Sequence, residues 1–194
     1  MLLFINLKHP ELMIRIFLLL FLIVFVSNDL CAQRYSTRNG IVRVMYDHPV
    51  AGSLETVNRQ VNVAFDVESG EIRMQILMLS FRFDRAFNQE IYNNYFVENP
   101  WYANARFEGH ITNIDQIDFD KPGIYTVEVS GDLVVREFAN PMSTTAEFVV
   151  NENFFEGEAL FDVYVRDYMH MINPTSAHWP DYVQVSMEVN MRRL

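Results

Sequence analysis

The segment IRMQILMLSFRF, residues 72–83, decides the fold class, and it leads through an aromatic-rich piece to ARFEGHI, residues 105–111. In its first half, apolar residues at every second position alternate with Arg73 and Gln75, as in a strand with one buried face. From Leu77 the apolar residues move to the opposite parity, which indicates a β-bulge or a strand covered on both faces. The stretch predicts strand, short helix, strand, which is more typical of a binding scaffold than of a catalytic one.

The piece RAFNQEIYNNYFVE, residues 85–98, resists a strand interpretation. Its apolar side chains fall at spacings of one and four, on one face of about three helical turns. These side chains are Ala86, Phe87, Ile91, Tyr95 and Phe96. Asp84 suits the N-cap and Asn99-Pro100 would stop the helix. We therefore expect one short helix, at about 85–98, after the third strand, covering one end of a barrel or packing across a sheet.

Turn residues divide the rest of the chain into short alternating segments, which is typical of an all-β protein. The strand candidates lie at about 41–46, 60–66, 71–83, 105–114, 123–136, 143–150, 156–167 and 182–191. The cleanest alternations are YTVEVSGDLVV and VQVSMEVNM, which begin at Tyr125 and Val183. They predict about eight antiparallel strands around a shared apolar interior, as an up-and-down barrel or a sandwich. Gly109 and Gly131 suit close backbone approach in a small barrel, although simply tolerated glycines explain them equally well.

Residues 1–32 are expected to be an export signal. Residues 14–26 are apolar apart from Arg15, and small residues follow. An apolar run of roughly 11 residues with a basic flank is typical of a signal, because a membrane span needs roughly 20. We expect cleavage near Ala32, giving a periplasmic or secreted domain of residues 33–194 with no stable membrane span. A retained N-terminal anchor is the alternative, and Met13 is a candidate for the true start.

Cys31 is the sole cysteine of the chain and the candidate residue for lipid attachment. Asn28 and Leu30 fit the usual lipid-attachment pattern poorly, since that pattern has Leu three residues before the cysteine and a small residue just before it. Cleavage after Ala32 would leave a protein without a cysteine and so without a disulfide.

The acidic charge of the chain argues against a nucleic-acid partner. The net charge is −10, and removing residues 1–32 leaves it unchanged because two basic and two acidic residues are lost together. A surface of this charge repels a polyanion.

The residues that could support catalysis have no recognisable arrangement. His110, His170 and His178 lack the short spacings of zinc ligands, and Asp162, Asp167 and Asp181 would pair only if the fold brought them together. Neither a nucleophile motif nor a phosphate-binding glycine loop is present. We therefore expect no enzyme activity, no metal and no cofactor.

The block FRFDRAFNQEIYNNYFVENPWYANARFEGHI, residues 81–111, resembles the signature of the YceI-like family. That family comprises lipocalin-like, polyisoprenoid-binding, exported bacterial proteins. The matching residues here are Ser80, Phe81, Phe83, Gln89, Glu90, Asn93, Glu98, Tyr102, Ala105, Phe107, Gly109 and Ile111. Further matches follow at Gly123, Tyr125, Val127, Gly131, Leu133, Phe161, Val163, Asp167, Tyr168 and Pro174. In this order they extend over about a hundred residues.

The chain departs from the family pattern at three places. Ile91 replaces a histidine of the helix, Ala103 replaces a proline, and residues 136–139 replace a His-Gly-Val-Thr-like turn. These changes remove polar groups that could meet a charged head group. An apolar ligand is therefore expected before a pyrophosphate-tailed one.

The resemblance implies a barrel whose apolar cavity holds an isoprenoid or fatty chain, and a barrel of about eight strands can enclose one small ligand. Methionine suits such a pocket because it is flexible and polarisable. The expected ligand-binding residues are Met74, Met78, Phe81, Phe83, Tyr92, Phe96, Trp101, Phe107, Met187 and Met191.

Two alternatives to an exported carrier remain open. The same side chains could fill a solid core, which would make the protein a structural or interaction module of the cell envelope. A small outer-membrane barrel would need a polar lumen. A homodimer is also possible.

Overall fold

The computed structural model describes residues 34–48, 52–96, 103–151, 154–168 and 180–193, without the side chains of residues 48, 91, 94–96 and 193. The predicted signal, residues 1–32, lies outside the described residues. So do His170 and His178.

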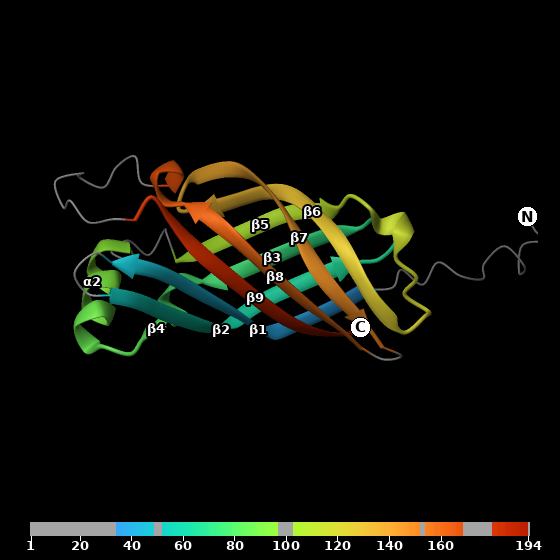
Figure 1. Ribbon diagram of the computed structural model, residues 1–194, viewed down its shortest axis with the longest axis horizontal. Helices are drawn as coiled ribbons and strands as arrows, with labels where there is room; N and C mark the ends of the chain where they lie inside the picture. The colour runs from blue at the N-terminus through green and yellow to red at the C-terminus, as the bar shows by residue number, and fades with distance from the viewer. Residues whose placement is uncertain (1–33, 49–51, 97–102, 152–153, 169–179, 194) are drawn as a thin grey trace, which may run out of the picture. The chain divides into compact units, whose positions relative to one another are not determined.

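The protein is a closed antiparallel β-barrel of eight long strands (Figure 1). The strands are β1 (Arg34–His48), β2 (Gly52–Asp66), β3 (Glu71–Leu77), β5 (Asn104–Ile111), β6 (Gly123–Val135), β7 (Phe138–Val150), β8 (Phe154–Tyr164) and β9 (Tyr182–Arg193). Their order is β1-β9-β8-β7-β6-β5-β3-β2, and the pairing of β1 with β2 closes the ring. The prediction of an all-β barrel with about eight strands and one short helix is confirmed.

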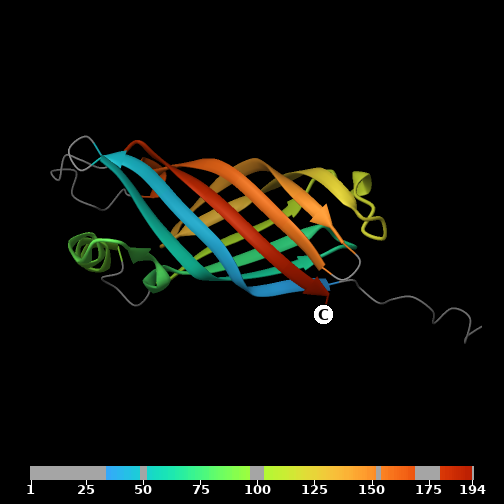
Figure 2. The ribbon, with the colours of Figure 1, turned by 60° about the horizontal axis from the view of Figure 1, so that its bottom comes forward.

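Five short elements of the described residues lie outside this ring. Strand β4 (Arg82–Phe83) pairs with β2, and the helix α2 (Ala86–Phe96) follows it. The three 3₁₀ turns are η1 (Met78–Ser80), η3 (Ile114–Gln116) and η4 (Val165–Tyr168). Figure 2 shows α2 at one end of the barrel and the segment that contains η3 at the other. No helix of the described residues is long and apolar enough to cross a bilayer.

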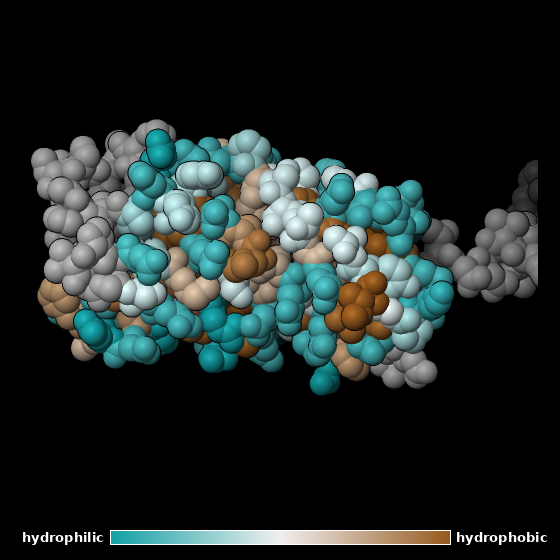
Figure 3. Space-filling view, in the orientation of Figure 1, coloured by the Kyte–Doolittle hydropathy of each residue, from teal (hydrophilic) through white to brown (hydrophobic). Residues whose placement is uncertain are grey.

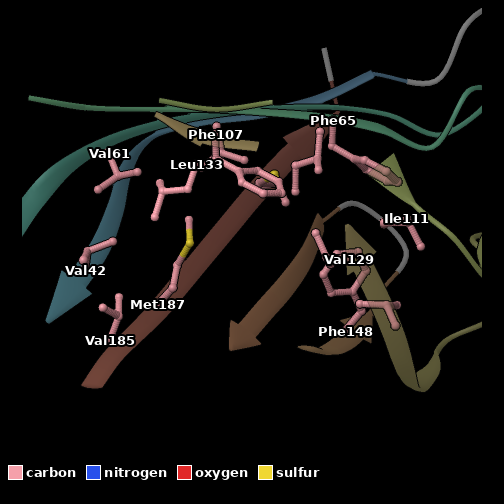
Figure 4. Packing of buried hydrophobic residues seen from close by; sticks show 14 of the residues in the cluster. Val42, Val61, Phe65, Phe107, Ile111, Val129, Leu133, Phe148, Val185 and Met187 are labelled. Atoms are coloured by element: carbon pink, nitrogen blue, oxygen red, sulfur yellow. The ribbon is translucent and has the colours of Figure 1, made fainter. Parts of the chain in front are cut away.

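The alternating pattern separates an apolar interior from a polar exterior. On β9, Val185, Met187 and Met191 are buried, whereas Gln184 and Asn190 are exposed. Figure 4 shows Val42 of β1, Leu133 of β6, and Val185 and Met187 of β9 directed into the interior. On the face seen in Figure 3, hydrophilic side chains predominate and hydrophobic ones form small separate groups.

Strands β1 and β2 are longer than predicted. They begin at Arg34 and Gly52, whereas the apolar pattern predicted strands from 41 and 60. Most of the additional residues of each strand pair with the predicted part of the other strand, in a ladder that runs from Arg34 opposite Asp66 to His48 opposite Gly52. The sequence analysis missed this part of β2 because two of its buried residues, Thr56 and Asn58, are polar and interrupt the apolar alternation.

The predicted strand 71–83 is wrong in its second half. Strand β3 ends at Leu77, and the 3₁₀ turn η1 then changes the direction of the chain before β4. This turn, rather than a bulge or burial on both faces, explains why the apolar residues change parity at Leu77.

Polar side chains from neighbouring elements satisfy the backbone where β3 breaks. The amide of Asn58 donates to the Leu77 carbonyl at 2.8 Å, and the hydroxyl of Thr56 donates to the Arg82 carbonyl at 3.0 Å. The hydroxyl of Tyr92 on α2 donates to the Met78 carbonyl at 3.0 Å. Because a buried carbonyl without a partner is costly, these bonds stabilise the break.

The helix α2 is slightly shorter than the predicted 85–98 and presents a different face to the barrel. The Arg85 carbonyl accepts the amide proton of Gln89 at 3.1 Å, so the N-cap is Arg85 rather than Asp84. Tyr92 is buried, whereas Phe87, which was predicted for the buried face, is 70% exposed. The ring of Tyr92 packs on those of Phe81 and Phe83, with centroid separations of 5.9 and 5.2 Å, and these contacts orient the helix.

Candidate ligand-binding cavity

The barrel contains a cavity of about 650 Å³. Residues from all eight long strands and from β4 and α2 line it. Its volume falls within the range of about 300–1,000 Å³ that is usual for sites that bind small molecules. The lining is mainly aliphatic, methionine and aromatic, as an apolar ligand requires.

An aromatic cluster fills the interior beyond one end of this cavity. Phe155 packs against Phe148, Phe65 and Tyr35, with ring centroids 5.0, 5.5 and 4.8 Å apart. Phe119, from the segment after η3, adds a contact to Phe65 at 5.6 Å. Phe148 also lines the cavity and so forms part of its floor.

The opposite end of the cavity is bounded by α2 and β4. Phe83, Phe87, Asn88 and Tyr92 line it there. Because Phe87 is largely exposed and also lines the cavity, this residue marks the side on which the cavity approaches the surface.

The structure brings eight of the ten predicted site residues to the cavity wall: Met74, Met78, Phe81, Phe83, Tyr92, Phe107, Met187 and Met191. Trp101 lies outside the described residues, and for Phe96 the structure describes the backbone alone. Contact of the eight with a ligand stays a prediction.

Several lining residues were missed by the sequence analysis. Met142 lies in the first half of β7, outside the predicted strand 143–150, and follows Pro141, a residue type typical of turns. The proline is tolerated because the β7–β8 ladder runs only from Ala146 to Val150, so the amide of residue 141 is not needed for pairing with β8. The inward alternation of Leu133 and Val135 on β6 could have identified both as lining residues.

Burial raises the pKa values of three tyrosines that line the cavity. Burial raises the pKa of Tyr92 well above its ordinary value of 10, and the nearby charge of Arg136 partly opposes that rise. Burial also raises the pKa values of Tyr46 and Tyr168, which line the cavity too. These three phenols are therefore neutral at physiological pH, as suits an apolar site.

Arg136 is the charged group of the lining that sequence reasoning missed. It occupies the β6–β7 turn, where the family pattern has histidine, and it lines the cavity. The expectation that this turn loses a group able to meet a charged head group therefore does not hold for Arg136. Glu158 also contributes to the wall, but its side chain is exposed.

The candidate catalytic residues that the structure describes do not come together in one site. Asp162, Asp167 and Asp181 are exposed and do not line the cavity, and Asp181 lies 3.6 Å from Arg166 in a surface ion pair. His110 is exposed as well. Within the described ranges, no three His, Cys, Asp or Glu side chains lie close enough to hold a metal ion.

A closed antiparallel barrel of eight long strands around an apolar cavity defines a lipocalin-like protein. The sequence matches the YceI-like domain over residues 34–192, and the chain belongs to that family. A comparison with the curated proteins finds no match.

Solved structures share the fold. The chain is similar to a polyisoprenoid binding domain from Saccharophagus degradans implicated in plant cell wall breakdown, with a TM-score of 0.69 at 10% identity, over 84% of this chain and 99% of that one. It is also similar to BcnA from Burkholderia cenocepacia, with a TM-score of 0.60 at 15% identity over 78% and 95% of the two chains. A Campylobacter jejuni YCEI protein gives 0.51 at 12% identity over 70% and 80%.

Proposed function

We propose that the protein binds one long apolar chain, isoprenoid or fatty, inside its barrel and carries or sequesters it without catalysing a reaction. The observation that carries this proposal is the cavity of about 650 Å³ within an apolar wall. The similar domain from Saccharophagus degradans is described as polyisoprenoid binding, which supports the same ligand class here.

The energy for binding comes from removing hydrocarbon from water. Each buried CH₂ group contributes about 0.8 kcal/mol. Association costs about 4–15 kcal/mol for lost translational and rotational freedom, and ordering of flexible groups adds to this cost. A chain of a dozen carbons therefore offsets the cost only when most of the chain is buried. This requirement favours a long chain over a small apolar molecule.

The ligand enters, on this proposal, from the α2 end. The aromatic rings of Phe65, Phe148 and Phe155 occupy the interior beyond the other end, with no room for a chain between centroids 5.0 to 6.1 Å apart. At the α2 end, the exposed ring of Phe87 borders the cavity. The methionine side chains of the wall can adapt to chains of different shape.

The alternative function, a structural module with a filled core, is less well supported. That alternative requires the inward side chains to occupy the barrel completely, whereas Met74, Met187 and Leu133 border open volume. Export is also part of the proposal: residues 1–32 would direct the domain to the periplasm or the outside of the cell, and N-terminal sequencing of the secreted protein tests it.

Binding of a neutral dye such as Nile red tests the proposal. The dye should gain fluorescence in the presence of the protein, and geranylgeraniol or dodecanol should displace it. Met187→Trp would fill part of the cavity and should weaken uptake of the dye with little change in melting temperature. Absence of uptake by the unmodified protein would contradict the proposal, as would a large loss of stability in the variant, which indicates a filled core.

A further inference from the structure

We propose that Arg136 binds an anionic head group, so that the preferred ligand is an apolar chain ending in a carboxylate or a phosphate. This inference rests on the proposed function and specifies its ligand. Arg136 would bind the polar head group of the ligand, whereas the apolar wall would bind its hydrocarbon chain.

The first argument is the position of Arg136. Val135 and Phe138 are the last paired residues of β6 and β7, so Arg136 and Glu137 form a two-residue turn at one end of these strands. Arg136 is nevertheless part of the cavity wall, together with Val135 and Leu133 from the same strand. A cation therefore borders a space whose wall is otherwise mainly apolar.

The second argument is the backbone of Arg136. Its φ is 60°, in the left-handed region where a residue with a Cβ is strained, and it is the one non-glycine residue of the described chain with positive φ. Glycine or asparagine would occupy this turn position at lower cost. Strain of this kind persists most often at binding sites, where a particular side chain is needed.

The third argument is the electrostatic surroundings. The charge of Arg136 acts on the buried phenol of Tyr92, which places the guanidinium near the α2 end of the cavity. Arg136 is the one cation among the described residues of the wall. A guanidinium can hold a carboxylate or phosphate with two parallel hydrogen bonds.

The position of Arg136 is consistent with the orientation that the ligand would have in the cavity. The apolar end of the ligand would occupy the cavity toward Phe148, and its head would stay near Tyr92 and Arg136, where the cavity approaches the surface. A carboxylate buried without a cation would bind less well than the corresponding alcohol, because desolvation of the charge is costly. The preference between acid and alcohol therefore reports on Arg136.

The test compares ligands that share one chain. Lauric acid, dodecyl phosphate and dodecanol, below their aggregation concentrations and at neutral pH, compete with Nile red for the protein. Both anions should bind about tenfold more tightly than the alcohol, as expected for one hydrogen-bonded charge. Inorganic phosphate alone should not compete, and competition by it would show a site for free anions instead of a head-group site.

Variants separate charge from folding. Arg136→Gln should remove the preference for the anions and should leave the affinity for dodecanol within about twofold of that of the unmodified protein. Arg136→Lys should keep most of the preference for the anions. Arg106→Gln is the matched control, because Arg106 lies on the adjacent strand β5, is exposed and does not line the cavity. Arg136→Gly provides a variant without backbone strain that should also lose the preference.

Three outcomes decide the matter. Loss of the preference in Arg136→Gln and Arg136→Gly, but not in Arg106→Gln, supports the inference. Equal binding of acid and alcohol by the unmodified protein overturns it and leaves the proposed function intact. Failure of all three ligands and of the dye overturns the proposed function itself.

Discussion

Gly131 on β6 lies directly opposite Gly109 on β5, and a Cβ atom added to Gly131 would lie 2.5 Å from the Gly109 Cα. A Cβ added to Gly109 would lie 2.7 Å from Cζ of Phe107, whose ring covers this glycine. Such separations are shorter than van der Waals contact. The two strands therefore approach closely here, which favours close backbone approach over simply tolerated glycines as the interpretation of the sequence.

Gly131→Ala should lower the free energy of unfolding by about 1–3 kcal/mol, because the added methyl group would force β5 and β6 apart. Urea denaturation measures this loss. Gly123→Ala is the control, since a Cβ there would meet only the side chain of Tyr125, at 3.3 Å. Equal losses in the two variants would contradict the close approach.

Valine-to-phenylalanine substitutions distinguish the cavity from the filled part of the core. Val127 is 0% exposed and does not line the cavity, so Val127→Phe should cost about 1–3 kcal/mol of stability. Val185 is 8% exposed and lines the cavity, so Val185→Phe should cost clearly less and should reduce dye uptake. Equal costs in urea denaturation would indicate that the cavity is not open in solution.

Tyr92→Phe should destabilise the protein by about 1 kcal/mol at neutral pH, because the Met78 carbonyl loses the hydrogen bond of the Tyr92 hydroxyl. The apolar contacts of the ring with Phe81 and Phe83 remain. Urea denaturation measures the effect, and an unchanged stability would show that the hydroxyl bond contributes nothing net.

The raised pKa of Tyr92 predicts a pH dependence. In the unfolded chain Tyr92 ionises at its ordinary value of 10, whereas in the folded protein burial keeps it protonated to higher pH. The unfolded state then binds fewer protons, so stability falls as the pH rises above about 10. This fall should be shallower in Tyr92→Phe, and an identical fall in both proteins would contradict the assignment.

Arg136→Gly should raise the free energy of unfolding by about 1 kcal/mol, since it relieves the strain of a side chain at a φ of 60°. Glu137→Gly is the matched control in the same turn, because Glu137 has no positive φ and glycine there costs about 0.5–1 kcal/mol of entropy. Thermal unfolding should shift in opposite directions in the two variants. Destabilisation by both would contradict the strain at Arg136.

The parts of the fold that follow from alternation could be predicted from the sequence. The sequences of strands β6 and β9 alternate between one apolar and one polar face, and most of the inward residues of these strands line the cavity. The predicted site residues on β3 and β9, Met74, Met187 and Met191, fit the same alternation, whereas the set as a whole came from the resemblance to the family. Closure of the barrel followed from the number of strands and the resemblance to the family.

The remaining parts depend on contacts that no local pattern reveals. The break after Leu77 is stabilised by Asn58, Thr56 and Tyr92, which lie far away in the sequence or on another element. The exposure of Phe87 depends on how α2 packs against the rings of Phe81 and Phe83. Arg136 was overlooked because nothing in the sequence places a turn residue against the cavity.

Mass spectrometry of the organic extract of purified protein tests the central claim most directly. The protein is produced in bacterial cells, purified without detergent and extracted into chloroform and methanol. The account predicts a near-stoichiometric amount of a lipid with a long apolar chain, and a much smaller amount from Val185→Phe, whose cavity is partly filled. An empty extract, together with no uptake of added lipid, would contradict it.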